Sequence, residues 1–246
     1  MGFISAELNA RFFKNLGMQV VRFEQPAITL TLNHFDFRKV IDVGANVGQF
    51  ALLLEKFNFS GEIYSVEPSS SAFEKLLVNS KRFPTWHVMP RCALGRAEGV
   101  ASLNVSKNSY SSSLLQILPK HTFAAPDSHY IEEESVSIKT LDGIFNTSEF
   151  LSRSCFLKID VQGFESEVLA GGGNLLSKIG GIKIELSLSS LYEGQASYKQ
   201  LLDQLDSLGF VIWNLEPGFR NMKSGETYQF DAILIHQSLL RPTDAH

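Results

Sequence analysis

Two glycines and two acids lie in the part of this sequence whose residue types and spacing most clearly predict a ligand-binding site. Gly44 and Gly48 follow a short apolar run that contains Asp42, and Glu67 comes about twenty residues after the turn. Glycines at such a turn let the backbone approach a ligand closely, and the following helix directs its N-terminus toward it. A carboxylate at the end of the next strand can accept both hydroxyls of a ribose. The pattern predicts a site for a ribose-bearing cofactor.

The spacing of the glycines discriminates between cofactors. A nicotinamide dinucleotide is bound by G-x-G-x-x-G, but Asn46 stands at the middle position here and Gln49 follows Gly48. The phosphate-binding pattern G-x-x-x-x-G-K-[ST] does not occur either. The turn D-V-G-A-N-V-G-Q-F suits S-adenosylmethionine, which has no phosphate groups. Its amino-acid end carries both charges, so Asp42 either orders the turn or faces the ammonium group.

Strands and helices alternate from residue 39 onward, which predicts a parallel sheet covered on both faces. The helix expected at 72–79 is preceded by a capping-box pattern, Ser71 with Glu74. Strands are expected at 40–43, 62–67, 86–89, 156–160 and 181–186, and further helices at 48–57, 165–169 and 198–208.

Two segments depart from this alternation. The apolar runs at 210–218 and 228–236 are joined by about ten residues, too few for a helical crossover, so these strands are expected to be antiparallel. Residues 91–140 hold short alternating runs around a polar stretch at 106–134, which predicts an inserted hairpin and a long loop, at about 95–135.

Composition limits the kinds of partner. The 246 residues are 44% hydrophobic and 20% charged, as in soluble globular proteins, and the net charge of −4 disfavours nucleic acid and anionic membrane as partners. No apolar run reaches the roughly 20 residues of a membrane helix, and the start lacks a secretion signal, so we expect a cytoplasmic protein. Cys92 and Cys155 lie in apolar surroundings and are expected to be buried thiols.

The N-terminal residues predict an amphipathic helix, because Ile4, Leu8, Phe12 and Leu16 recur every fourth residue. Such a helix packs on the domain or on a second subunit of a homo-oligomer, with a lid over the substrate as the alternative. The expected division is an N-terminal helix and lead-in strand region at 1–37, a main domain at 38–238 and a tail at 239–246.

Six segments carry a family resemblance: VIDVGANVGQFA (40–51), YSVEPS (64–69), CALG (92–95), SSSL (111–114), VSIKTLD (136–142) and FLKIDVQGFESEVLAG (156–171). In this order they resemble the FkbM-type family of S-adenosylmethionine-dependent methyltransferases, and the resemblance spans 38–236. It implies an α/β, Rossmann-like class I methyltransferase fold with a doubly wound, mostly parallel seven-stranded sheet and an antiparallel C-terminal strand. It also implies methyl transfer to a hydroxyl of a sugar or secondary metabolite, with S-adenosylhomocysteine as product. One position departs from the family, which commonly has Glu where this chain has Gln162.

The matching motifs supply the candidate cofactor contacts. Ser111, Ser112 and Ser113 bind cofactor or acceptor, or form a flexible serine run. The full set of cofactor candidates is Asp42, Gly44, Ala45, Asn46, Gly48, Glu67, Pro68, Ala93, Ser113 and Asp160.

Three acids are candidates for catalysis, since an acceptor alcohol must lose its proton. Asp160 ends a strand at the ligand-binding edge of the sheet and ranks first, as base, as metal ligand or as a cap of the following turn. Glu165 lies near a helix start, where the helix dipole already favours an acid. Glu185 lies within an apolar strand, which is costly unless the charge is paired, and Lys158 and Lys183 can pair with acids.

Other candidates are weaker. No metal-spacing motif supports a metal ion. His121 and His129 fall in the long polar segment, where a solvated loop histidine is expected more than one that reaches an acceptor. Three rival functions remain: a methyltransferase acting on nucleic acid or protein, whose Asn-Pro-Pro-aromatic motif is missing here; a non-catalytic binding module; and a nicotinamide oxidoreductase.

Overall fold

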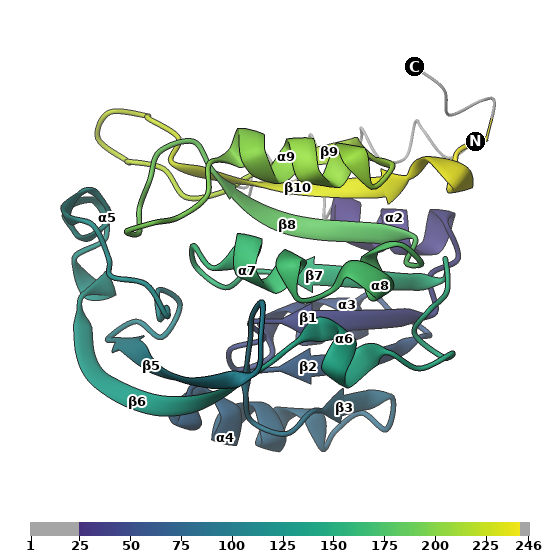
Figure 1. The fold of residues 1–246 in the computed structure, drawn as a ribbon, viewed down its shortest axis with the longest axis horizontal. Helices are drawn as coiled ribbons and strands as arrows, with labels where there is room; N and C mark the ends of the chain where they lie inside the picture. The colour runs from purple at the N-terminus through teal and green to yellow at the C-terminus, as the bar shows by residue number, and fades with distance from the viewer. Residues whose placement is uncertain (1–24, 242–246) are drawn as a thin grey trace, which may run out of the picture.

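The computed structural model describes residues 25–241, which are built around a seven-stranded sheet (Figure 1). The strand order is β3-β2-β1-β7-β8-β10-β9. β10 is antiparallel to both of its neighbours, and the other pairs are parallel. The strands are β1 (Lys39–Val43), β2 (Glu62–Val66), β3 (Trp86–Val88), β7 (Cys155–Ile159), β8 (Gly181–Ser187), β9 (Phe210–Pro217) and β10 (Gln229–His236).

This topology confirms the predicted doubly wound sheet with an antiparallel C-terminal hairpin. The chain builds outward from β1 to β3 on one side and from β7 to β8 on the other, so the strand order reverses between β1 and β7. In sheets of this kind the crevice at the reversal point, outside the carboxyl ends of the strands, is where ligands bind.

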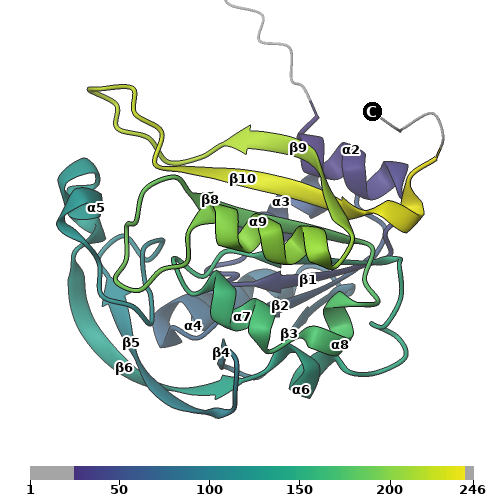
Figure 2. The same cartoon turned by 45° about the horizontal axis from the view of Figure 1, so that its top comes forward.

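Helices cover both faces of the sheet (Figures 1 and 2). One core cluster includes Leu32, Leu54 and Leu76 from the helices of the first face, and a second includes Leu169 and Leu205 from those of the other. The first face carries α2 (Ala27–His34), α3 (Gln49–Lys56) and α4 (Ser70–Ser80); the second carries α6 (Leu141–Phe145), α7 (Glu165–Ala170), α8 (Gly173–Leu176) and α9 (Tyr198–Ser207).

The insertion forms a second, three-stranded sheet in the order β4-β6-β5, in which β5 and β6 are the expected hairpin. The long loop predicted through residue 134 is shorter than expected, because β6 already begins at Tyr130 and two short helices form before it. The elements are β4 (Ala93–Leu94), β5 (Gly99–Ser106), α5 (Pro119–Ala124), the 3-10 turn η1 (Pro126–Ser128) and β6 (Tyr130–Lys139).

The predicted capping box at Ser71 is wrong. Helix α4 begins two residues earlier than expected, with Ser69 as N-cap and no side-chain cap bond. Instead, the backbone N–H and hydroxyl of Ser70 donate to the Glu134 carboxylate on β6, at 2.8 and 2.9 Å. An acid from the insertion therefore accepts a hydrogen bond from a free backbone N–H group at the start of α4. The same contact connects the insertion to a helix that packs on the main sheet.

The ends of the chain differ from expectation where they are described. Residues 27–34 form helix α2 in place of a lead-in strand region, and the 3-10 turn η2 (Gln237–Leu239) follows β10. The helix predicted around 4–16 lies outside the described residues. Among residues 25–241, no helix has the length and apolarity needed to cross a membrane.

Candidate active site

A cavity of about 230 Å³ opens at the reversal point, between the carboxyl ends of β1, β2 and β7 and the insertion. Asp42 and Gly48 are not among its lining residues. The candidate cofactor contacts that line it are Gly44, Ala45, Asn46, Glu67, Pro68, Ala93, Ser113 and Asp160.

Both glycines of the turn have left-handed backbone conformations, but they serve different contacts. Gly44 has φ +72°, and a Cβ there would lie 1.9 Å from the backbone oxygen of Asp160. Gly48 has φ +93° at the N-cap of α3, and its Cβ would lie 2.4 Å from the ring of Trp86. Glycine is required at 44 so that β1 and β7 meet at the cavity, and at 48 so that α3 packs against β3.

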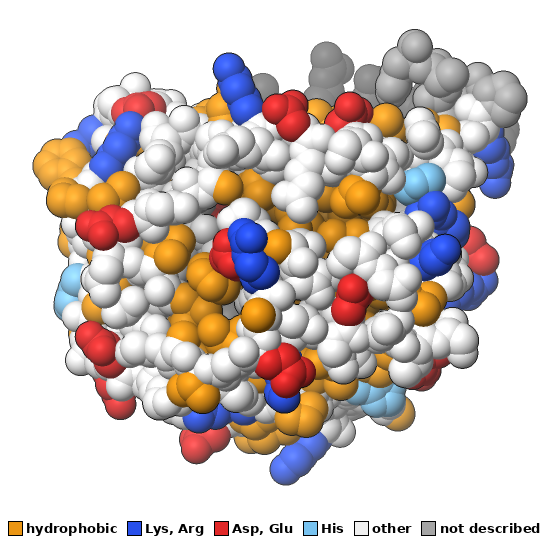
Figure 3. Space-filling view, in the orientation of Figure 1, with side chains coloured by type: hydrophobic (Ala, Val, Ile, Leu, Met, Phe, Trp, Pro, Cys, Tyr) orange, Lys and Arg blue, Asp and Glu red, His pale blue; other side chains and the backbone are white. Residues whose placement is uncertain are grey.

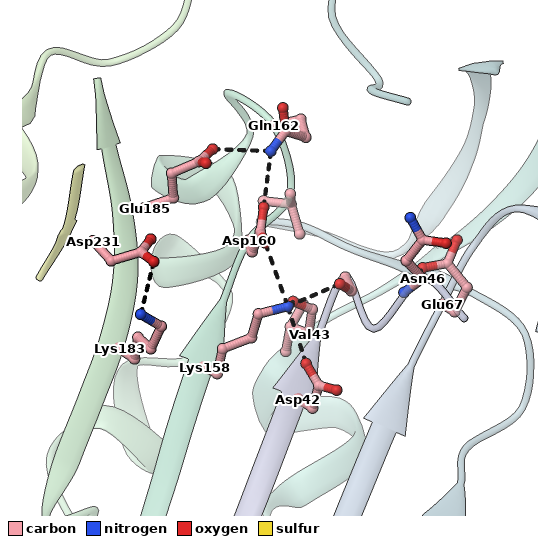
Figure 4. Close-up of polar contacts among 12 residues, drawn as sticks. Asp42, Val43, Asn46, Glu67, Lys158, Asp160, Gln162, Lys183, Glu185 and Asp231 are labelled. Carbon is pink, nitrogen blue, oxygen red and sulfur yellow. Dashed lines mark hydrogen bonds and ion pairs between the residues drawn. The ribbon is translucent and has the colours of Figure 1, made fainter. Parts of the chain in front are cut away.

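Asp42 supports this turn from within the sheet. Its side chain is fully buried, with Oδ1 3.0 Å from Nζ of Lys158 (Figure 4). Lys158 also donates to the carbonyl oxygens of Val43, at 3.3 Å, and Gly44, at 2.9 Å. Burial by itself lowers the pKa of Lys158, but the charges of Asp42 and Asp160 outweigh it and raise the pKa above its ordinary value. Of the two roles expected for Asp42, this geometry matches the ordering of the turn.

Glu67 is a buried acid on the cavity wall, directly after β2. Its Oε2 accepts from the backbone N–H of Asn46 at 2.7 Å, and Oε1 accepts from that of Ser69 at 2.8 Å. Burial raises the pKa of Glu67 to about 7, and the two backbone hydrogen bonds oppose that rise. Each carboxylate oxygen still has capacity for a further donor, so the group is fixed in place and able to accept from a ligand.

Asp160 is the most accessible of the three candidate catalytic acids. Its side chain is 41% exposed, and Oδ2 lies 3.7 Å from Nζ of Lys158. Oδ1 accepts from Nε2 of Gln162 at 2.9 Å. The carboxylate is thus held between an ammonium and an amide, and one side of it faces the cavity.

Gln162 joins several parts of the site. It has φ +54°, and its Nε2 donates to Glu185 Oε2 at 2.9 Å as well as to Asp160 (Figure 4). Its Oε1 accepts from the hydroxyl of Tyr192 at 2.8 Å, and its backbone oxygen accepts from Ser113 Oγ at 2.7 Å. An amide is required for this bridge, because a carboxylate at the same place has no N–H to donate to the two acids.

The other two candidate acids point elsewhere. Glu165 is buried, and its Oε1 accepts from the backbone N–H groups of Val161 and Gly163, at 3.2 and 3.1 Å. Burial raises the pKa of Glu165 to about 7. Glu185 accepts from Gln162 and from Gln229, the latter at 2.6 Å; burial and the charge of Asp160 raise its pKa well above the usual value. Neither residue lines the cavity.

The two strand lysines both pair with acids, as the sequence allowed. Lys158 pairs with Asp42, and Lys183 Nζ lies 2.5 Å from Glu216 and 2.7 Å from Asp231. Glu185 is not one of these partners and is satisfied by amides instead.

The expectation of a solvated His121 is wrong. Its side chain is buried on α5, with ring centroids 5.3 Å from Tyr192 and 5.1 Å from Phe219, and burial lowers its pKa to about 4. His129 is exposed, as expected of a loop histidine, and its Nδ1 lies 2.8 Å from the carbonyl oxygen of Pro126. Neither histidine lines the cavity.

The serine run is ordered by contacts within the insertion and with the loop after β7. The hydroxyl of Ser112 lies 3.3 Å from that of Ser106, and Ser113 donates to Gln162. Both Ser112 and Ser113 line the cavity, whereas Ser111 does not. Sequence reasoning assigned no role to Tyr110 or Phe164, which also line the cavity, and expected of Lys158, a further lining residue, only that it could pair with an acid.

The two cysteines are buried and free, as predicted, and Cys92 lines the cavity. Among residues 25–241, no group of three or more His, Cys, Asp or Glu side chains is placed to hold a metal ion.

The strand order, the antiparallel β10 and a cavity at the β1–β7 reversal define a class I methyltransferase fold. The chain belongs to the FkbM methyltransferase family: the family model described as "Methyltransferase FkbM domain" matches residues 42–212.

Two characterised relatives match parts of the chain. Hexuronic acid methyltransferase AglP of Haloferax volcanii is 28% identical over 170 residues, covering 68% of this chain and 63% of that protein. 2-O-methyltransferase NoeI of Sinorhizobium fredii is 47% identical over 53 residues, 22% of each chain. The match therefore spans less than two thirds of the length of either relative.

The solved structures that align with the chain are more distant in sequence. A methyltransferase FkbM from Methylobacillus flagellatus KT aligns with a TM-score of 0.48 at 16% identity, over 80% of this chain and 44% of that one. M. capricolum TrmK, in complex with S-adenosyl-homocysteine, aligns with a TM-score of 0.48 at 10% identity, over 87% and 70%.

Proposed function

We propose that this chain is an S-adenosylmethionine-dependent O-methyltransferase that acts on a hydroxyl group of a small molecule, a sugar or a related metabolite. The observation that carries the proposal is the pair of acids in one cavity. Glu67 is fixed after β2 with free acceptor capacity, and Asp160 is accessible after β7.

The cavity residues fit the cofactor. Glu67 would accept the ribose hydroxyls, and the Gly44–Asn46 turn would lie against the amino-acid end. Pro68, Ala93 and Leu94 offer apolar surface for the adenine ring. When bound, S-adenosylmethionine supplies a methyl group on a positively charged sulfur; as the acceptor oxygen bonds to this methyl group, the carbon–sulfur bond breaks and S-adenosylhomocysteine leaves as a neutral thioether.

Asp160 would act as the general base. The acceptor hydroxyl must lose its proton as the oxygen–methyl bond forms, and a carboxylate within hydrogen-bond reach can take it. Lys158 and Gln162 hold Asp160 from two sides, which restricts its orientation. Because displacement requires an in-line approach, a fixed base and a fixed acceptor supply much of the rate.

Two further features support a small hydroxyl acceptor. The names of the relatives specify a hexuronic acid and a 2-O position, both of which place methyl transfer on oxygen-rich substrates. The net charge of −4 also disfavours nucleic acid; on the face in Figure 3, Lys and Arg side chains near the centre lie beside acidic ones, with several more at the right-hand edge.

Calorimetric titration of the full chain with S-adenosylmethionine, S-adenosylhomocysteine and NAD tests the cofactor. We expect micromolar dissociation constants for the first two and no heat with NAD. Binding of NAD alone, or no binding of any of the three compounds, would contradict the proposal.

A further inference from the structure

The lysines that line the cavity are neutralised by acids of the protein. Its lining contains two acids, Glu67 and Asp160, and two lysines, Lys158 and Lys183. Lys158 forms an ion pair with Asp42 and donates to two backbone carbonyl oxygens. Among the described lining residues there is no arginine and no lysine that lacks a carboxylate partner.

Acids outnumber cations on the side of the cavity toward β8. Glu185, Asp231 and Glu216 lie directly opposite one another on β8, β10 and β9, so they share one face of the sheet. Burial raises the pKa of Glu185 well above its usual value, so Glu185 is left out of the charge balance. Lys183 lies between Glu216 and Asp231, and one cation against two carboxylates leaves an excess of negative charge there. Asp160 adds a further carboxylate nearby, held by the same Gln162 that contacts Glu185 (Figure 4). A second anion entering this region would meet repulsion from these carboxylates, and the lining lysines are already paired with acids of the protein.

Tyr110 provides an apolar surface at the same cavity. Its side chain is 64% exposed although it lines the cavity, so its ring contributes little burial to folding. The preceding residue, Ser109, has φ +59°, and its hydroxyl lies 3.4 Å from the side chain of Asn46 in the glycine turn. The insertion is therefore bonded to the cofactor turn next to an aromatic ring that is accessible to a ligand.

Resting on the proposed function, we propose that the acceptor is an uncharged sugar ring that packs on Tyr110, and that a sugar bearing a carboxylate is disfavoured. The C–H face of a sugar carries partial positive charge and suits the negative face of an aromatic ring. Its hydroxyls suit Asp160 and the serine hydroxyls of the rim. A uronate would bring its charge toward Asp160 and the acids around Lys183.

Pairs of acceptors that differ only in a carboxylate test whether a charged sugar is disfavoured. Methyl glycosides of glucose, galactose and mannose, and the matching uronates, are compared by release of S-adenosylhomocysteine from the full chain. For a sugar that is accepted as substrate, we expect kcat/KM to be at least about tenfold higher for the neutral glycoside than for the matching uronate. Raising the salt concentration should bring the two kcat/KM values closer together, because salt screens the repulsion between the uronate and the acids of the protein.

The outcomes separate this inference from the proposed function. Failure to bind S-adenosylmethionine contradicts the proposed function. Normal cofactor binding with equal or better transfer to uronates, or with no transfer to any sugar of the panel, overturns the inference alone.

Substitutions of Tyr110 test whether its ring is the surface on which the sugar packs. Tyr110→Ala should raise KM for the accepted neutral glycoside by about fivefold or more, with kcat and cofactor affinity little changed, and Tyr110→Phe should restore KM. Phe123→Ala is the matched control, since Phe123 is a 76% exposed aromatic of the same insertion that does not line the cavity. A KM for Tyr110→Ala equal to that of the control would overturn the role of Tyr110.

A charge variant tests the repulsion independently. Asp231→Asn removes one of the two acids around Lys183 without changing a lining residue. We expect kcat/KM for uronates to rise by about threefold or more, and that for neutral glycosides to stay within about twofold. An equal change for both classes would contradict the electrostatic argument.

Discussion

Asp42 and Lys158 form an ion pair inside the sheet, directly opposite one another on β1 and β7, with Oδ1 and Nζ 3.0 Å apart. Lys158 also donates to the carbonyl oxygens of Val43 and Gly44. The pair therefore joins the two central strands at the point where the glycine turn begins, and it couples the stability of the sheet to the shape of the cavity.

Breaking this pair should cost much stability. Lys158→Met leaves Asp42 charged and buried, and we expect the free energy of unfolding to fall by about 3–5 kcal/mol. The double variant Asp42→Leu/Lys158→Met should recover part of that loss, because no buried charge remains. Lys39→Met, at the more exposed Lys39–Glu62 pair, is the control and should cost about 1 kcal/mol or less. Urea unfolding measures all three; a loss at Lys158 no larger than at Lys39 would contradict the argument.

Removing the Glu67 carboxylate should weaken cofactor binding. In Glu67→Ala the proposed ribose acceptor is lost, and the N–H groups of Asn46 and Ser69 lose their partner. We expect the dissociation constant for S-adenosylmethionine to rise by about tenfold or more. Glu62→Ala, at the other end of β2, serves as control and should bind normally. Unchanged affinity in a folded Glu67→Ala protein, measured by calorimetry, would remove the ribose role.

Replacing Asp160 should separate catalysis from binding. Asp160→Asn keeps the size of the side chain but cannot take a proton, so we expect kcat to fall by about 100-fold or more. The affinity for S-adenosylmethionine should stay within about threefold, because Glu67 and the glycine turn are intact. Single-turnover rates with an accepted glycoside give the first quantity and calorimetry gives the second. Turnover close to that of the wild type would exclude Asp160 as the base.

Glu165 should make stability depend on pH. Burial raises its pKa to about 7 in the folded protein, against an ordinary value near 4.5 in the unfolded chain. The folded state thus keeps a proton that the unfolded state releases, so the contribution of Glu165 is fully present below about pH 4.5 and is lost as pH rises through 7. It amounts to roughly 3 kcal/mol at most.

Glu165→Gln isolates this effect, because the amide oxygen can still accept from Val161 and Gly163 but does not titrate. We expect the stability of the wild type, measured by urea unfolding between pH 5 and 8, to fall more steeply than that of the variant. Parallel curves would show that Glu165 does not hold its proton.

Much of the fold was predictable because its signals are local. The alternation of apolar runs with helical patterns needs only neighbouring residues, and the short connection after Pro217 by itself requires an antiparallel return. The same holds for Gly44, whose left-handed conformation no other residue adopts as easily, and for Glu67, whose position follows from the end of a strand.

The tertiary structure decided which acid does what. Asp160, Glu165 and Glu185 look alike in sequence, yet Asp160 faces the cavity, Glu165 binds backbone N–H groups and Glu185 is satisfied by Gln162 and Gln229. Likewise, His121 lies in a polar stretch but is buried under Tyr192. The partners of Glu185 and His121 are distant in the sequence and are brought together by folding. Those of Glu165 are close in the sequence, but only the folded backbone turns their N–H groups toward it. The environment of a side chain, and hence its proton affinity and its access to a ligand, is a property of that three-dimensional neighbourhood and is not carried by residue type and spacing.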